Sequence, residues 1–126
     1  MRERHLLQAV IAIGALVPIS GGLGGILKGA GLLAGSPADT HFAYLSGLLL
    51  AIGLAFWASI PRIEAHGARV SLLAALVVTG GCARLAAIIA SGTADRAALL
   101  PLAMELGVTP ALWLWQRRVA QTSPGP

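Results

Sequence analysis

Two oppositely charged residues, Arg84 and Glu105, interrupt long apolar stretches of the sequence. A single unpaired charge in the middle of a membrane-spanning helix costs on the order of 3 kcal/mol. A guanidinium and a carboxylate in contact offset much of that cost, because they form two charge-assisted hydrogen bonds. These residue types therefore predict a buried ion pair wherever the chain brings them to the same level of a membrane.

The spacing of the two residues favours such a pair. In a helical hairpin whose turn centres on Ala94, Arg84 lies ten residues before the centre and Glu105 lies eleven residues after it. At about 1.5 Å of rise per residue, both reach nearly the same depth. We expect Gly80 and Gly81, one turn before Arg84, to leave room for its stem, because helical side chains lean toward the N-terminus. An alternative is that Arg84 extends to the outer interface.

Further polar residues are predicted at a similar depth or just outside it, where they could line a polar cavity open to the non-cytoplasmic side. His41 and Tyr44 also suit a simpler role at the membrane interface, and no second histidine or acid stands at metal-ligand spacing beside His41. We expect no metal, no cofactor and no catalytic residue. The candidate ligand-binding residues are Arg84, Glu105, Tyr44, His41, Thr109 and Ser20.

The composition identifies the solvent of these side chains. Of the 126 residues, 56% are hydrophobic and only 11% are charged, whereas a soluble domain carries about 25% charged residues. The net charge of +4 comes from basic residues in the gaps between apolar runs, which is typical of membrane topology signals and not of a nucleic-acid-binding face. We therefore expect the lipid bilayer, and no nucleic acid, as the partner. The single cysteine, Cys82, excludes an internal disulfide.

Four apolar runs each approach the roughly 20 residues that a helix needs to cross the hydrocarbon core. Lipid cannot satisfy backbone N–H and C=O groups, so these spans must be helices. The sequence predicts an all-α fold, an integral membrane four-helix antiparallel bundle with both termini cytoplasmic. We expect one domain over residues 1–118, with helices at about 5–27, 41–60, 69–91 and 96–116, and a disordered polar tail over 119–126.

Local signals mark the ends of these helices. Asp39 or Thr40 can cap the second helix, and Gly92 follows the third. Pro18 removes a backbone hydrogen bond just before a run of four glycines at 21–25, so we expect a kink or a break in the first helix there. Small residues at every fourth position also predict close helix packing on the second, third and fourth helices. These stripes are Ala43 to Ser59, Ser71 to Ala87, and Ala103 to Ala111.

The arginines predict the orientation. Six basic residues lie on the side shared by the two termini and the second connection, against two on the opposite side. This bias places both termini in the cytoplasm. A cleaved signal peptide is the alternative for the first run, but that run is longer than the usual apolar region of about 7–15 residues.

Several of these motifs resemble those of a known family. They are His41-Phe42 at the start of the second helix, Pro61-Arg62 after it, the segment Gly80-Gly81-Cys82-Ala83-Arg84, and Glu105 in the fourth helix. With them the chain resembles a bacterial family of small four-span membrane proteins, domain of unknown function 4345, and more loosely the DoxX-type four-helix membrane proteins. The resemblance implies a multi-pass protein of the bacterial inner membrane and no particular activity.

Two classes of function remain open. The first is a non-catalytic membrane module that binds a lipid, a quinone-like ligand or a larger membrane complex around the Arg84–Glu105 pair. The second is a small membrane enzyme or redox-linked protein that uses Glu105 and Arg84 on a hydrophobic substrate. We favour the first, because no nucleophile–base pair or metal constellation is apparent. The pair can also be purely structural, since a buried ion pair can fix which helices meet.

Overall fold

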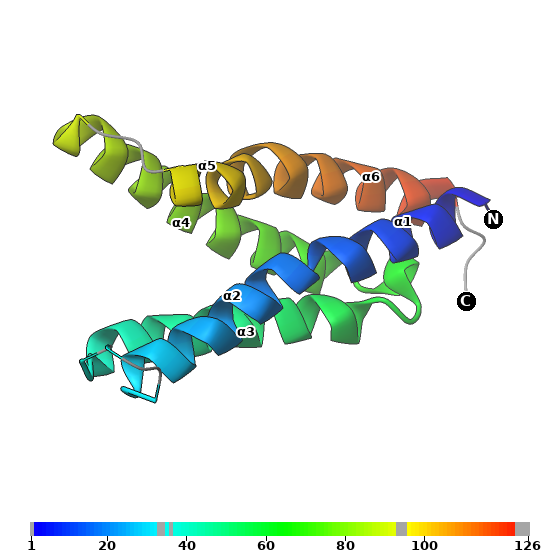
Figure 1. The fold of residues 1–126 in the computed structure, drawn as a ribbon. Coiled ribbons are helices and arrows are strands. Elements are labelled where there is room, and N and C mark those ends of the chain that lie inside the picture. The colour runs from blue at the N-terminus through cyan, green and yellow to red at the C-terminus, as the bar shows by residue number, and fades with distance from the viewer. Residues whose placement is uncertain (1, 33–34, 36, 93–95, 123–126) are drawn as a thin grey trace. The chain divides into compact units, whose positions relative to one another are not determined.

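The computed structural model describes residues 2–32, 35, 37–92 and 96–122, and every regular element within those ranges is helical. Figure 1 labels the main helices in chain order. The elements are α1 (Arg2–Gly14), α2 (Leu16–Gly29), α3 (Thr40–Ser59), the 3-10 helix η1 (Ile63–Ala65), α4 (Gly67–Ser91), α5 (Arg96–Ala103), the π-helical turn η2 (Met104–Val108) and α6 (Thr109–Thr122). The predicted hairpin centre, Ala94, lies outside the described residues.

Among the described residues, four helical stretches are long and apolar enough to cross a membrane: Arg2–Gly29, Thr40–Ser59, Gly67–Ser91 and Ala98–Thr122. Many large apolar side chains on them are exposed, Ile89 by 71% for example. Such a surface is unfavourable in water and suits contact with lipid tails. The predicted number of apolar helices is therefore confirmed, and it is consistent with a multi-pass membrane protein.

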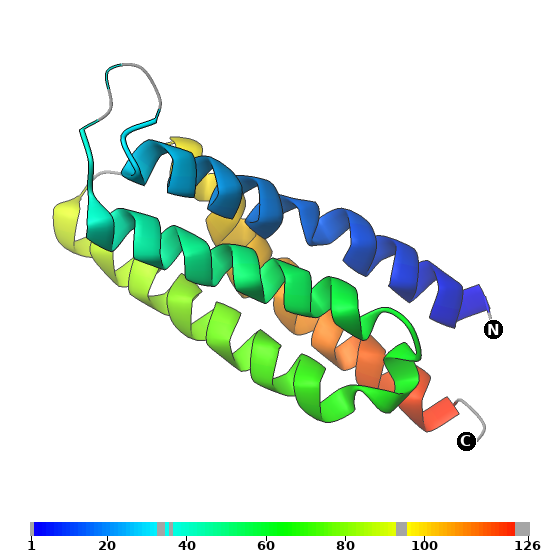
Figure 2. The ribbon, with the colours of Figure 1, turned by 90° about the horizontal axis from the view of Figure 1, so that it is seen from below.

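The chain forms two compact units, one of residues 1–8 and 61–126 and the other of residues 9–60. In the unit of residues 9–60, α2 and α3 pack against each other and lie side by side in both views (Figures 1 and 2). In the other unit, α4 packs against α5, η2 and α6. Arg84 and Glu105 belong to this unit of residues 1–8 and 61–126.

The first apolar stretch is interrupted at Ala15, between α1 and α2. Pro18 has no N–H to donate to the carbonyl of Gly14, four residues earlier, so the α-helical bond that would cross this point is missing. The break was predicted for the proline and glycine region as a whole. The structure places it one turn before Pro18, and the glycine run that follows is helical.

Gly22 and Gly29 lie where α2 and α3 approach each other closely. A Cβ atom added at Gly22 would lie 2.6 Å from the backbone nitrogen of Leu50, and one added at Gly29 would lie 2.7 Å from that of Ala43. The partner's residue numbers fall as those of α2 rise, so the two helices run in opposite directions. Only glycine permits backbones to approach this closely.

The predicted signals at two helix ends are confirmed. The carboxylate of Asp39 accepts a hydrogen bond from the backbone N–H of Phe42 at 3.0 Å and caps α3. Gly92, in the left-handed conformation with a φ of 71°, ends α4 and donates its N–H to the carbonyls of Ile88 and Ile89. Left-handed backbone at this position favours glycine.

Two sequence expectations need correction in the unit that holds α4 and α6. The helix α6 continues to Thr122 because Val119 is 2% exposed and packs in the interior, so residues 119–122 are not part of a disordered tail. Residues 123–126 lie outside the described residues. The small-residue stripes also do not form the contact between α4 and α6, since Ala83 on α4 and Ala111 on α6 are exposed.

Candidate functional site

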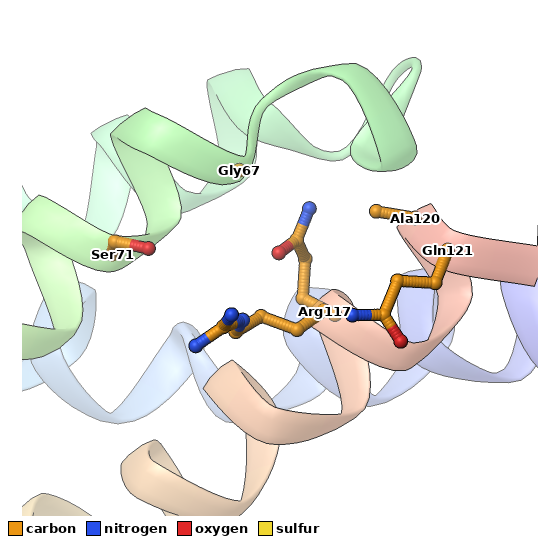
Figure 3. A pocket seen from close by; sticks show the side chains of 6 residues that line it. Gly67, Ser71, Arg117, Ala120 and Gln121 are labelled. Atoms are coloured by element: carbon orange, nitrogen blue, oxygen red, sulfur yellow. The ribbon is translucent and has the colours of Figure 1, made fainter. Parts of the chain in front are cut away.

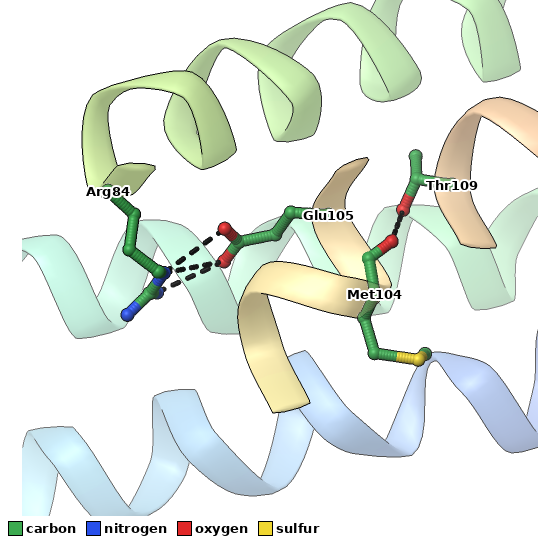
Figure 4. A network of polar contacts seen from close by, with 4 residues as sticks. All are labelled: Arg84, Met104, Glu105 and Thr109. Carbon is green, nitrogen blue, oxygen red and sulfur yellow. Dashed lines mark hydrogen bonds and ion pairs between the residues drawn. The ribbon is translucent and has the colours of Figure 1, made fainter. Parts of the chain in front are cut away.

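The Arg84 and Glu105 side chains meet between α4 and η2. The Arg84 Nε atom lies 3.1 Å from Oε2 and 3.3 Å from Oε1 of Glu105, and Nη2 lies 3.0 Å from Oε1. Figure 4 shows these contacts as dashed lines, with one guanidinium nitrogen pointing away from the carboxylate. The guanidinium therefore engages both carboxylate oxygens, which is the stronger form of arginine–carboxylate contact.

The two members of the pair differ in exposure. The Arg84 side chain is 38% exposed and the Glu105 side chain 14%. Among the described residues, Nη1 of Arg84 has no hydrogen-bond partner. The carboxylate is thus enclosed by the protein, whereas part of the guanidinium is presented outward from an apolar helix.

A glycine on α4 sets the distance between the two elements. A Cβ atom added at Gly81 would lie 2.8 Å from Cβ of Glu105 and 2.9 Å from Cδ2 of Leu106. Gly81 therefore lets η2 approach α4, one helical turn before Arg84. The expectation that Gly80 and Gly81 make room for the arginine stem is wrong in this detail, because Gly80 faces open space and Gly81 faces Glu105.

Glu105 lies in a rare backbone conformation. In η2 the backbone N–H of Thr109 donates to the carbonyl of Met104, five residues earlier, and the Thr109 hydroxyl donates to the same oxygen at 2.8 Å. Figure 4 shows Thr109 and Met104 joined in this way beside the ion pair. Pro101 and Pro110, on either side of the turn, have no N–H, so two bonds that would keep α-helical register are missing. π-helical turns are often found at functional sites.

The remaining candidate residues lie in different places. Thr109 is 9% exposed and its hydroxyl serves the π-helical turn. Ser20, His41 and Tyr44 belong to the unit of residues 9–60 and are exposed. The Ser20 hydroxyl donates to the carbonyl of Leu16 in its own helix at 2.6 Å. Of the six candidates, Arg84 and Glu105 are the two whose side chains the structure brings into contact.

A second polar cluster was missed by the sequence reasoning. Gln116 on α6 is completely buried and donates from Nε2 to the carbonyl of Ile63 at 2.9 Å. Nearby, the indole N–H of Trp113 donates to the hydroxyl of Ser71 on α4 at 2.8 Å. The available signal was a glutamine beside two tryptophans at the end of an apolar run, which is where polar and aromatic groups meet at a membrane surface.

A second ion pair joins Arg4 of α1 to Glu64 of η1. Its carboxylate accepts a hydrogen bond from Nε of Arg4 at 2.7 Å. This hydrogen bond is the main reason that the pKa of Glu64 lies below its usual value. A weaker contact of 3.4 Å joins Arg118 near the end of α6 to Glu3. Both pairs tie the start of α1 to other parts of the same unit.

The site has limited chemical options. Within the described residues, no three histidine, cysteine, aspartate or glutamate side chains gather where they could hold a metal ion. The Arg84–Glu105 pair combines a shielded carboxylate with an outward guanidinium donor, an arrangement that can hold an oxygen acceptor.

Comparison with known proteins identifies a family for most of the chain. The family model described as "Domain of unknown function (DUF4345)" matches residues 6–116, which is most of the chain. No curated protein and no solved structure matches. The matched range includes α4, η2 and both charged residues of the pair.

Proposed function

The chain belongs to the family of the domain of unknown function 4345, and we propose that it is a non-catalytic ligand-binding module of the bacterial inner membrane. In this proposal, four antiparallel spans form one bundle with both termini in the cytoplasm. Arg84 and Glu105 form the polar part of a seat for a lipid or quinone-like molecule. A larger membrane partner is the alternative occupant.

The ion pairs near the helix ends support the proposed topology. Arg4 contacts Glu64, and Arg118 contacts Glu3. These contacts hold together the N-terminal segment, the connection after α3 and the end of α6, which are the three basic segments of the sequence. A common location for them is what the positive-inside rule requires of cytoplasmic ends.

The observation that carries the binding role is the unused donor of Arg84. Its helix, Gly67–Ser91, has a mean hydropathy of 2.1 over its most apolar window. A guanidinium N–H directed into hydrocarbon without an acceptor is unfavourable. A phosphate, carboxylate or carbonyl oxygen of an amphiphilic ligand would satisfy Nη1, while Glu105 holds the other side of the guanidinium in place.

The second candidate function is a membrane enzyme or redox-linked protein that uses Glu105 and Arg84 on a hydrophobic substrate. The π-helical turn beneath Glu105 favours it, because such turns recur at functional sites. Against it, a general acid or base must reach a proton of the substrate, and both carboxylate oxygens of Glu105 are already engaged by Arg84. We therefore place the enzyme second.

The proposed seat rests on Arg84 and Glu105 alone. The Thr109 and Ser20 hydroxyls already donate to the carbonyls of Met104 and Leu16. His41 and Tyr44 stay candidates through their predicted depth in the membrane.

The test is to identify what co-purifies with the protein from native membranes in mild detergent. Wild type, Glu105→Gln and the control Thr79→Val are compared by mass spectrometry of bound small molecules. Thr79 lies on α4, the helix of Arg84, and its hydroxyl donates to the carbonyl of Ala75 in that helix. We expect an amphiphile in wild type and in the control, and its loss in Glu105→Gln.

Two outcomes would reject the ligand seat. The first is that purified wild type carries no more amphiphile than a mock purification from membranes that lack the protein. The second is an amphiphile retained equally by Glu105→Gln, which would make the pair a structural contact. A turnover product found only with wild type would favour the enzyme.

A further inference from the structure

A hollow of about 350 Å³ lies between the start of α4 and the end of α6, away from the Arg84–Glu105 pair. Figure 3 shows Ser71 on α4 and Arg117 on α6 beside it. A water molecule takes up about 30 Å³ of liquid, so the hollow has room for a larger polar group. The residues that line it are Gly67, Ser71, Gln116, Arg117, Ala120 and Gln121.

The buried amide of Gln116 lacks one partner. Its Nε2 donates to the carbonyl of Ile63, which fixes the orientation of the amide because a carbonyl must face the nitrogen. Its Oε1 is buried and has no hydrogen-bond partner among the described residues. A buried acceptor without a donor is unfavourable, so the hollow is suited to a group that carries an N–H or O–H.

The other side of the hollow offers donors for an anion. Arg117 stacks over the ring of Trp113, with 5.1 Å from its guanidinium carbon to the ring centroid. Ser71 accepts the indole N–H of Trp113, and its own hydroxyl hydrogen is left to donate. The amides in the first turn of α4, which begins at Gly67, have no side-chain cap and favour negative charge.

We propose that this hollow binds a phospholipid headgroup that carries both a phosphate and a primary ammonium. The phosphate lies at Arg117 and Ser71, and an ammonium N–H donates to Oε1 of Gln116. The exposed side chains of Leu72 and Leu114, which are 61% and 59% exposed, follow Ser71 and Trp113 in sequence and are available to the acyl chains. A lipid therefore fits better than free phosphate, because the free anion could satisfy these polar groups but would leave the two leucine side chains without an apolar partner.

The test compares headgroups that differ only at nitrogen. The full-length protein is exchanged into nanodiscs that contain phosphatidylethanolamine and phosphatidylcholine with identical acyl chains, and retained lipid is measured by native mass spectrometry. Both headgroups carry the phosphate, but the trimethylated nitrogen of choline has no N–H to donate. We expect wild type to retain phosphatidylethanolamine at least about fivefold over phosphatidylcholine, since one buried hydrogen bond separates them.

Two variants separate the two halves of the site, and a third serves as a control. Gln116→Leu should retain the two lipids equally, and Arg117→Leu should lose both. The control Arg118→Leu, whose side chain is 71% exposed and outside the hollow, should match wild type. The first two variants change only the hollow, so failure of this test is distinct from failure at the Arg84–Glu105 pair.

The proposal is overturned if wild type retains both lipids equally, which would mean that water satisfies Gln116. It is also overturned if inorganic phosphate displaces the lipid at equal concentration, which would indicate a site for the free anion. Because the comparison of headgroups needs only the wild-type protein, a Gln116→Leu variant that fails to fold leaves the test decisive.

Discussion

A methyl group at Gly81 is the smallest change that should separate η2 from α4. The added Cβ would lie 2.8 Å from Cβ of Glu105 and 2.9 Å from Cδ2 of Leu106. Carbon atoms in contact prefer separations of about 3.5–4.0 Å, so the two elements must move apart by at least about 0.7 Å. Overpacking of this kind typically costs about 1–3 kcal/mol.

The neighbouring glycine provides a matched control. A Cβ atom added at Gly80 has no atom within 4 Å. Both substitutions to alanine bring the same gain in helix propensity, about 0.8–1.0 kcal/mol in soluble helices. The difference in unfolding free energy between Gly81→Ala and Gly80→Ala therefore isolates the packing cost, and we expect Gly81→Ala to be less stable by about 1–3 kcal/mol.

The assay is equilibrium unfolding of both purified variants in the same detergent. Movement of η2 would also carry Glu105 away from Arg84, so we expect Gly81→Ala to lose bound amphiphile as well. Equal stability of the two variants would refute the reasoning, because it would show that α4 and η2 do not meet through Gly81.

Two other perturbations test the packing and the polar connections. Gly22→Ala should lower the melting temperature, because its Cβ would lie 2.6 Å from the backbone of α3. Gly24→Ala, with open space around the added Cβ, should not. Equal melting temperatures of the two variants would contradict the close contact of α2 and α3 at Gly22. The Arg4 hydrogen bond lowers the pKa of Glu64 in the folded state. The contact therefore contributes its full stabilisation when the pH is above the pKa of Glu64 in the unfolded chain, about 4.3, and loses it as the pH falls through the pKa in the folded state. Acid unfolding of Glu64→Gln should therefore show a smaller loss of stability over that range, by less than about 1 kcal/mol, and an unchanged pH profile would exclude the contribution.

Hydropathy and local signals predicted the four apolar helices and two of their ends. This success has a physical reason, because a span needs only enough consecutive apolar residues, and Asp39 and Gly92 act through their own neighbouring backbone. The exact position of the break at Ala15 was harder to predict from the sequence. A proline removes a bond one turn earlier, and the helical glycines after it show that glycine content alone does not end a helix.

The packing faces could not be read from composition. Alanine and glycine are so frequent that several stripes had suitable spacing, and the choice among them depends on which face meets a neighbour. The true contacts use Gly22 and Gly29 on α2 and Gly81 on α4. The π-helical turn at Glu105 was also missed, since it depends on the joint effect of Pro101 and Pro110 on one stretch of backbone.

The most direct test of the ligand seat is the charge exchange Arg84→Glu with Glu105→Arg. The exchange keeps an ion pair between α4 and η2 but moves the unused guanidinium donor to the other element. Native mass spectrometry of the purified protein should show that the exchanged variant folds and has lost the amphiphile carried by wild type. Retention of the same molecule at the wild-type level would contradict the claim that the outward donor of Arg84 holds it.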